Sequence, residues 1–158
     1  MIDPKEIMYE EGRRQALDLA ARAPEMDGTA IIAEEQKIPA WSENAVYTAD
    51  HVGFPVQDAG QIYTIEMPHT PAHNPGCRPA DLRAIYSLKH TKDPAKAKPW
   101  AASYGVSGLY IVDECCTHPA ADGTTHVFRN KHDNNEFPPL TLNVEDRWED
   151  LGEVSLWQ

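Results

Sequence analysis

The sequence is short of cysteine, of basic residues and of long apolar segments. Its three cysteines, Cys77, Cys115 and Cys116, are too few and too unevenly spaced for a disulfide framework, so we expect reduced thiols. Fourteen lysines and arginines stand against 25 aspartates and glutamates, and the net charge of -11 argues against nucleic acid as a partner. No stretch approaches the roughly 20 apolar residues that cross a bilayer, so we expect no contact with a membrane.

Signals for export and for catalysis are also missing. The first residues show no basic region followed by an apolar one, so we expect synthesis in the cytosol without a signal peptide. The sequence contains no Gly-rich phosphate loop and no Gly-x-Ser-x-Gly elbow, and none of its cysteines has the flanking glycines of a known nucleophile. We therefore expect no enzyme, no catalytic residues and no cofactor.

Helix signals are concentrated in residues 1–37. Asp3 and Pro4 form a helix start, in which the aspartate caps free N–H groups and the proline fits the first turn. Good helix formers continue to Ala23, and Pro24 supplies the stop. The apolar stripe is thin and interrupted by charges, so this helix has little reason to be stable alone. We expect a segment that anchors the chain or joins copies of it; the alternative is a helix that lies across its own β-module.

The rest of the chain is divided by proline and glycine into short elements. Asp27-Gly28-Thr29 is a cap signal, and we expect a short helix at residues 30–35, with a strand as the alternative. Thirteen prolines and nine glycines leave few long uninterrupted stretches after about residue 38. We expect a mainly β (α+β) fold, in which an N-terminal α-helix is followed by two small antiparallel β-modules rich in loops.

The first module is expected at residues 38–88. Segments 46–48 and 61–65 are β-branched and aromatic, with turn residues at 58–60 in the loop between them, which predicts a hairpin with an enlarged loop. The proline-rich segment 69–79 should have no regular structure.

The second module is expected at residues 99–158, after a linker at residues 89–98. It repeats the order of the first loosely, with an apolar segment at 110–112, a turn at 122–123 and a strand at 126–128. The intervals differ from those of the first module, so we interpret it as a diverged second copy.

A series of aromatic, glycine and histidine residues runs through the first module. Its members are Trp41, Asn44, Tyr47, Gly60, Tyr63, Pro68, His69, Thr70 and the closing segment Arg83-Ala84-Ile85-Tyr86. This pattern resembles the small chitin-binding modules of carbohydrate-binding families 5 and 12. The resemblance implies that these residues build the module scaffold, above all Trp41, Tyr47, Gly60, Tyr63, His69, Thr70 and Tyr86.

One position departs from that family in a way that bears on ligand binding. In the family, an exposed tryptophan shortly before the proline that corresponds to Pro79 stacks on a sugar ring. Cys77 stands at that position here. Sugar recognition needs a flat aromatic face, which a thiol lacks, so chitin binding by the first module is not expected.

Pairs of such modules behind an N-terminal helix resemble structural proteins of tailed bacteriophages. The resemblance implies a virion component, such as a head fibre or decoration, a tail part or a baseplate part, whose partners are copies of itself and other virion proteins. A trimer would suit a fibre-like part, removal of residues 1–37 should leave folded monomers, and Trp157 is the best ring for a subunit contact. The alternatives are a module that recognises a chitin-like or cell-surface glycan and a bacterial adaptor domain outside phages.

The remaining candidate residues are rings and soft metal ligands. In the glycan alternative, Trp100, Tyr110 and Trp148 of the second module would contact the ligand, although such rings more often build a core. Two patterns contain soft metal ligands, His69, His73 and Cys77 in one and Cys115, Cys116 and His118 in the other. Spacing by four aligns ligands only on a helix, and prolines interrupt any helix in the first pattern. We expect no metal site.

Overall fold

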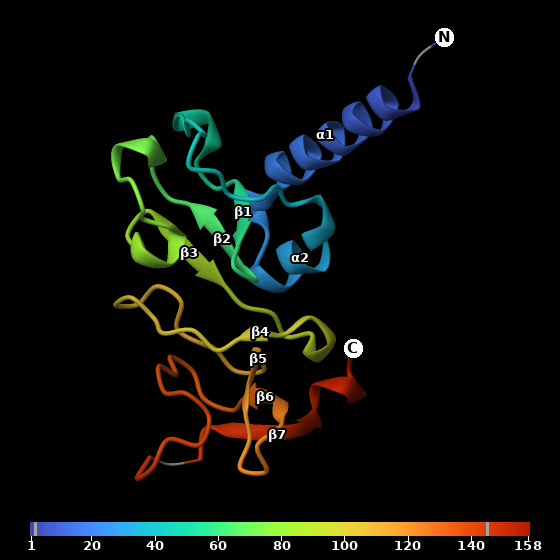
Figure 1. The fold of residues 1–158 in the computed structure, drawn as a ribbon. Helices are drawn as coiled ribbons and strands as arrows, with labels where there is room; N and C mark the ends of the chain where they lie inside the picture. The colour runs from blue at the N-terminus through green and yellow to red at the C-terminus, as the bar shows by residue number, and fades with distance from the viewer. Residues whose placement is uncertain (2, 145) are drawn as a thin grey trace.

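The structure is a computed structural model that describes residues 1, 3–144 and 146–158. A long N-terminal helix is followed by two small β-sheets, which confirms the expected α+β fold class (Figure 1). Short 3-10 turns connect the main elements at Ala23–Glu25, Glu35–Lys37, Ala49–His51, Pro71–His73, Pro79–Asp81, Pro94–Lys96 and Val154–Leu156. Within the described part of the chain, no helix has the length and apolar character that a membrane span requires.

Helix α1 (Pro4–Arg22) begins and ends where the sequence predicts. The Asp3 carboxylate caps the first turn by accepting a hydrogen bond from the backbone N–H of Lys5, at 2.9 Å. The helix gives way to a 3-10 turn at Pro24. Only its last turns are buried, through Leu19 and Ala20, and the rest runs away from the body (Figure 1).

Helix α2 (Gly28–Ala33) is capped by Asp27, which accepts a hydrogen bond from the Ala30 N–H at 2.8 Å, and the expectation of a short helix here is confirmed. Its buried isoleucines join the end of α1 and strand β2 (Gln61–Ile65) in one apolar cluster, formed by Leu19, Ala23, Ile31, Ile32, Ile38 and Ile62. Residues 19–38 therefore contribute to the core of the body. Removal of residues 1–37 would strip this cluster, so it cannot serve as a clean test of the helix.

The first sheet contains β1 (Pro55–Asp58), β2 (Gln61–Ile65) and β3 (Tyr86–Lys89), paired antiparallel in that order. The β1–β2 hairpin closes over Ala59 and Gly60, which have φ angles of 50° and 77°. Positive φ at both central residues is the geometry of a two-residue type I′ turn, and glycine adopts it without steric cost.

The expected hairpin of the first module is correct in one strand and wrong in the other. Residues 46–48 form no strand, because Tyr47 makes only an isolated bridge to His69. The partner of β2 is β1, whose residues we had placed in the loop. A two-residue turn joins β1 to β2 directly. Pairing between these two neighbours therefore prevails over pairing of β2 with residues 46–48, which lie further away along the chain. Segment 69–79 holds only 3-10 turns.

The second sheet contains β4 (Lys98–Pro99), β5 (Cys115–Pro119), β6 (Thr125–Asn130) and β7 (Trp148–Glu153), in that order. The short β4–β5 pair is parallel, and the other pairs are antiparallel. The expected turn lies between β5 and β6, and the expected strand lies within β6. The apolar segment at Tyr110 is not a strand and makes one bridge to another loop. The second module therefore does not repeat the first strand for strand.

Residues 89–98, which we expected to be a linker, are packed against the body. Thr91 and Ala97 are buried, and the two ends of the segment belong to β3 and β4. The backbone of His90 passes so close to Gly28 that a Cβ at residue 28 would overlap the His90 carbonyl oxygen. Only glycine permits this approach between α2 and the segment that joins the two sheets.

Candidate functional site

The N-terminal part of α1 is the most exposed regular element of the described chain. We call residues 4–14 the α1 tip; every residue in it is exposed, and Figure 1 shows the helix projecting from the body. Ile7, Met8 and Tyr9 carry large apolar side chains in the tip, and Met8 and Tyr9 are 74% and 81% exposed. A projecting helix of about three turns is only marginally stable in water. Its exposed apolar side chains would be stabilised by burial against a partner.

The charges of α1 are separated along its length. Lys5 and three glutamates give the stretch before Gly12 a net charge of -2, whereas three arginines and Asp18 give the stretch after it +2. This order complements the helix dipole, which favours acidic side chains near the N-terminus and basic ones near the C-terminus.

Ion pairs fix the base of α1 to the body. Arg22 forms a two-pronged pair with Glu34, at 2.8 and 2.9 Å, and also contacts Asp18 at 3.0 Å. Hydrogen bonds from Arg22 and then from Lys37 lower the pKa of Glu34 to about 2. Planar guanidinium–carboxylate pairing holds two groups in one orientation, so the direction of the tip is set by the body.

A small apolar cavity of about 230 Å³ lies where α1 meets the first module. Its walls come from both parts, with Leu17 and Ala20 on the helix and Phe54, Val56 and Ile65 on the module. Leu17 is itself largely exposed, so the apolar surface of the helix continues from the cavity towards the tip.

The scaffold residues of the first module meet at the hydroxyl of Tyr86. Trp41 Nε1 donates to this hydroxyl at 2.8 Å, and His69 Nε2 bonds to it from the other side. His69 Nδ1 lies 2.9 Å from the backbone oxygen of Met67, and the Tyr47 ring packs against the His69 ring. Burial raises the pKa of Tyr86 to about 12. The sequence pattern thus brings together four of its rings in one connected unit.

The other scaffold residues have separate places. Gly60 forms the β1–β2 turn, Tyr63 is buried on β2, and Thr70 is half-buried with its backbone oxygen accepting from the His73 N–H at 3.0 Å. Cys77, at the position of the family's sugar-stacking ring, is half-buried. The guanidinium of Arg78 lies 5.0 Å from the centre of the Trp41 ring.

The three rings proposed as glycan contacts lie together in the core of the second module. Tyr110 and Trp148 are 2% and 6% exposed, and Trp100 is half-buried against the same cluster. The Tyr110 ring is stacked on His90 at 3.6 Å, and Trp148 Nε1 donates to the Phe137 backbone oxygen at 2.9 Å. Rings covered in this way pack the interior and do not offer a face to a sugar in this conformation.

The soft ligands considered from sequence do not converge. Cys115 and Cys116 are both buried, and burial raises the pKa of the Cys115 thiol to about 11 and that of Cys116 further. Thiols of this kind stay protonated near neutral pH, and neither is a ready nucleophile or metal ligand.

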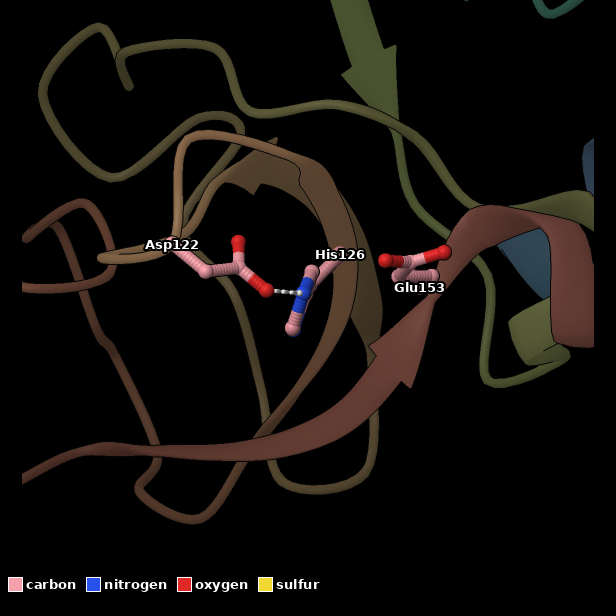
Figure 2. Close-up of side chains that lie close together, drawn as sticks. All are labelled: Asp122, His126 and Glu153. Carbon is pink, nitrogen blue, oxygen red and sulfur yellow. Dashed lines mark hydrogen bonds and ion pairs between the residues drawn. The ribbon is translucent and has the colours of Figure 1, made fainter.

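A different group of metal-ligating side chains does converge. Among residues 1, 3–144 and 146–158, three or more such side chains meet only at Asp122, His126 and Glu153 (Figure 2). The hydrogen bond that the Asp150 carboxylate accepts from the imidazole raises the pKa of His126. The sequence patterns missed this group because pairing of β6 with β7 brings Glu153 opposite His126 from far along the chain.

Comparisons with known proteins add no relative. No protein-family model matches the sequence, and no curated protein and no solved structure matches the chain. The features of the chain that bear on its function are therefore the α1 tip, the two modules and the group of Asp122, His126 and Glu153, which we call the His126 group.

Proposed function

We propose that this chain is a structural component of a tailed-phage virion that assembles through the α1 tip. In this role the two β-modules form a rigid body, and the tip joins copies of the chain or attaches it to other virion proteins. A head-fibre, decoration, tail or baseplate part would each use this layout. The chain has no catalytic step in this proposal, and its strong negative charge disfavours nucleic acid as a partner.

The projecting α1 tip carries the proposal. Its helix is longer than its contact with the body requires, because burial is confined to the last turns. The exposed Ile7, Met8 and Tyr9 would lose contact with water on assembly, at a gain of roughly 25 cal/mol for each Å² of apolar surface covered. The ion pairs of Arg22 hold the tip in a fixed direction, which lowers the entropy lost on assembly.

The architecture of the modules supports a role as rigid parts. The shared hydroxyl of Tyr86 connects the scaffold rings of the first module, and the rings of the second lie in its core. Glycan recognition, the alternative function, would need an exposed flat ring. Tyr110 and Trp148 are buried, and Arg78 lies over Trp41, so the observations favour assembly over sugar binding.

The oligomeric state of the purified chain tests the assembly step. We expect sedimentation velocity to show a defined oligomer. A trimer is the oligomeric state that suits a fibre-like part. A chain that lacks residues 1–14 should be a folded monomer, because this deletion leaves the buried end of α1 in place. A full-length monomer across a wide range of concentrations would contradict the proposal.

A substitution variant tests whether assembly needs the apolar side chains of the tip or only the helix itself. Ile7→Gln, Met8→Gln and Tyr9→Gln together replace the exposed apolar side chains with a good helix former. We expect this variant to be monomeric with an unchanged circular dichroism spectrum. Val106→Ser changes an apolar side chain that is 90% exposed outside α1, and it should leave the oligomer intact.

The place of the chain in a particle tests the virion assignment directly. Antibodies against the purified chain should label intact tailed-phage particles in immunogold electron microscopy. Particles from a phage that lacks the gene provide the control, and labelling equal to that control would remove the assignment while leaving self-assembly standing.

A further inference from the structure

His126 is surrounded by oxygen atoms on both sides of its ring. It lies on β6, its side chain is 13% exposed, and Asp122 in the β5–β6 turn faces it (Figure 2). Its Nδ1 atom is 2.7 and 2.9 Å from the carboxylate oxygens of Asp150 on β7. Its Nε2 atom is 3.1 Å from Asp122 Oδ2 and 2.9 Å from Thr124 Oγ1.

The hydrogen bonds around the ring place a carboxylate at each of its two nitrogen atoms. Asp150 accepts the proton on Nδ1, and Asp122 accepts from Nε2 when that atom carries a proton, so an ion bound at Nε2 would take the place of that second proton. The Thr124 hydroxyl donates to Asp122 Oδ1 at 2.7 Å, so its oxygen also presents a lone pair to Nε2. Oxygen atoms of the hydroxyl and the carboxylate therefore face Nε2, where a bound ion would meet them.

A further carboxylate borders that space. Glu153 pairs with His126 in the β6–β7 register, and one ligand atom from each of Asp122, His126 and Glu153 lies within 4.8 Å of the others. Along the described chain, neither lysine nor arginine forms an ion pair with these two carboxylates or with Asp150. The group thus collects three acidic side chains around a single imidazole.

We propose that Asp122, His126 and Glu153 bind a divalent transition-metal ion, with zinc as the best fit, and that Asp150 positions the imidazole. An imidazole nitrogen with carboxylate oxygens is a donor set for zinc and disfavours magnesium and calcium, which take oxygen ligands. A carboxylate that accepts the other ring N–H of a metal-bound histidine orients the ring and raises its basicity. Asp150 has that relation to His126.

The distances require only a modest closure. Zinc–oxygen and zinc–nitrogen bonds of about 2.0 to 2.2 Å place tetrahedral ligand atoms about 3.3 Å apart. Asp122 and Glu153 are both exposed, and their side chains are free to approach His126, which the β-sheet holds in place. A water molecule would complete four-coordination. The bound ion would tie the β5–β6 turn to the end of β7 independently of the α1 tip.

Calorimetric titration of the full chain with zinc, after removal of metals with a chelator, tests this site. The titration uses a Cys77→Ser background, which removes the one thiol that is not buried. We expect one saturable site per chain and a higher melting temperature with zinc, and neither effect with magnesium. Cobalt in place of zinc should give the visible absorption of a tetrahedral site.

Three variants test the roles of the residues around the imidazole. His126→Gln should abolish the saturable site, and Asp150→Asn should weaken the affinity about 10- to 100-fold, as loss of such a positioning carboxylate does. His118→Gln is the matched control, because His118 lies opposite His126 on β5 but outside the group, and it should bind zinc like the parent. Equal binding by His126→Gln, loss of binding in His118→Gln, or no saturable site in the parent would each overturn the proposal.

Discussion

The two modules build their interiors differently. The core of the first consists of aliphatic side chains and rings, namely Val56, Tyr63, Ile65, Tyr86 and Leu88. The second also buries Asn130 and Asn135, which are joined by a hydrogen bond of 2.9 Å, and Asn130 donates to the Ile111 backbone oxygen at 2.8 Å. Side-chain amides in the second core thus bond to the backbone of nearby loops.

The difference lies in the side chains that bond to a long connection, and not in the length of that connection. Residues 66–85 between β2 and β3 and residues 131–147 between β6 and β7 are both long connections with little regular structure among those described. A long loop that packs on a core must find partners for its backbone N–H and C=O groups. Buried asparagines supply them, and a network of this kind is strongly stabilising only while every member is bonded.

The largest expected contrast is between Trp41 of the first module and Trp148 of the second. Trp148→Ala should lower the free energy of unfolding by about 3 to 5 kcal/mol, because it empties a buried site and leaves the Phe137 backbone oxygen without its donor. Trp41→Ala should cost less, because Trp41 is half-buried. Urea unfolding followed by circular dichroism measures both, and an equal loss would contradict the contrast.

The second expected effect is a pH dependence that arises at His90, in the segment that joins the two sheets. Burial lowers the pKa of His90 to about 4, from 6.5, so its stability contribution is fully present above pH 6.5. As the pH falls from 6.5 to 4, the unfolded state binds one more proton than the folded state. The free energy of unfolding should then fall by on the order of 3 kcal/mol.

His90→Gln isolates this pH effect. Glutamine does not titrate and offers an N–H for the Gly108 backbone oxygen, to which His90 Nε2 is bonded at 2.8 Å. The difference in unfolding free energy between the two proteins, measured at pH 7.5 and pH 4.5, cancels the contributions of the other titrating groups. An identical pH slope in both would show that His90 does not carry the effect.

The smallest expected effect compares two buried tyrosine hydroxyls. Tyr86→Phe should cost about 1 to 2 kcal/mol, because Trp41 Nε1 and His69 lose their common partner. Tyr110→Phe should change stability little, because its hydroxyl has only a long contact of 3.4 Å with the Ala101 N–H. Thermal unfolding of the two variants measures the difference, and the reverse order would contradict the network described around Tyr86.

Local signals predicted the helical part of the fold. The caps at Asp3 and Asp27 and the stop at Pro24 are encoded within a few residues, so the bounds of α1 and the presence of α2 follow from the sequence, although α2 begins and ends two residues before the expected range of 30–35. The hairpin was placed with the wrong partner because the strand propensity of residues 46–48 is real, but pairing depends on the turn that brings two strands together.

Non-local contacts account for what the sequence did not predict. Stacking of His90 on Tyr110 and the approach of Gly28 to His90 depend on segments far apart in the chain, so composition alone suggested a linker at residues 89–98. The His126 group depends on the β6–β7 register in the same way. The aromatic pattern of the first module indicated which rings belong together, but their hydrogen bonds to the Tyr86 hydroxyl required the three-dimensional structure.

The close approach of Gly28 to the His90 backbone has a mechanical consequence. A hinge between the sheets would need slack in the connecting segment, and this contact removes it at a point directly beside α2. A force on the projecting end of α1 would therefore turn α2 and the connecting segment together, with little bending between them. A side chain at position 28 would separate α2 from the His90 backbone and loosen this contact, without altering the α1 tip or the second sheet directly.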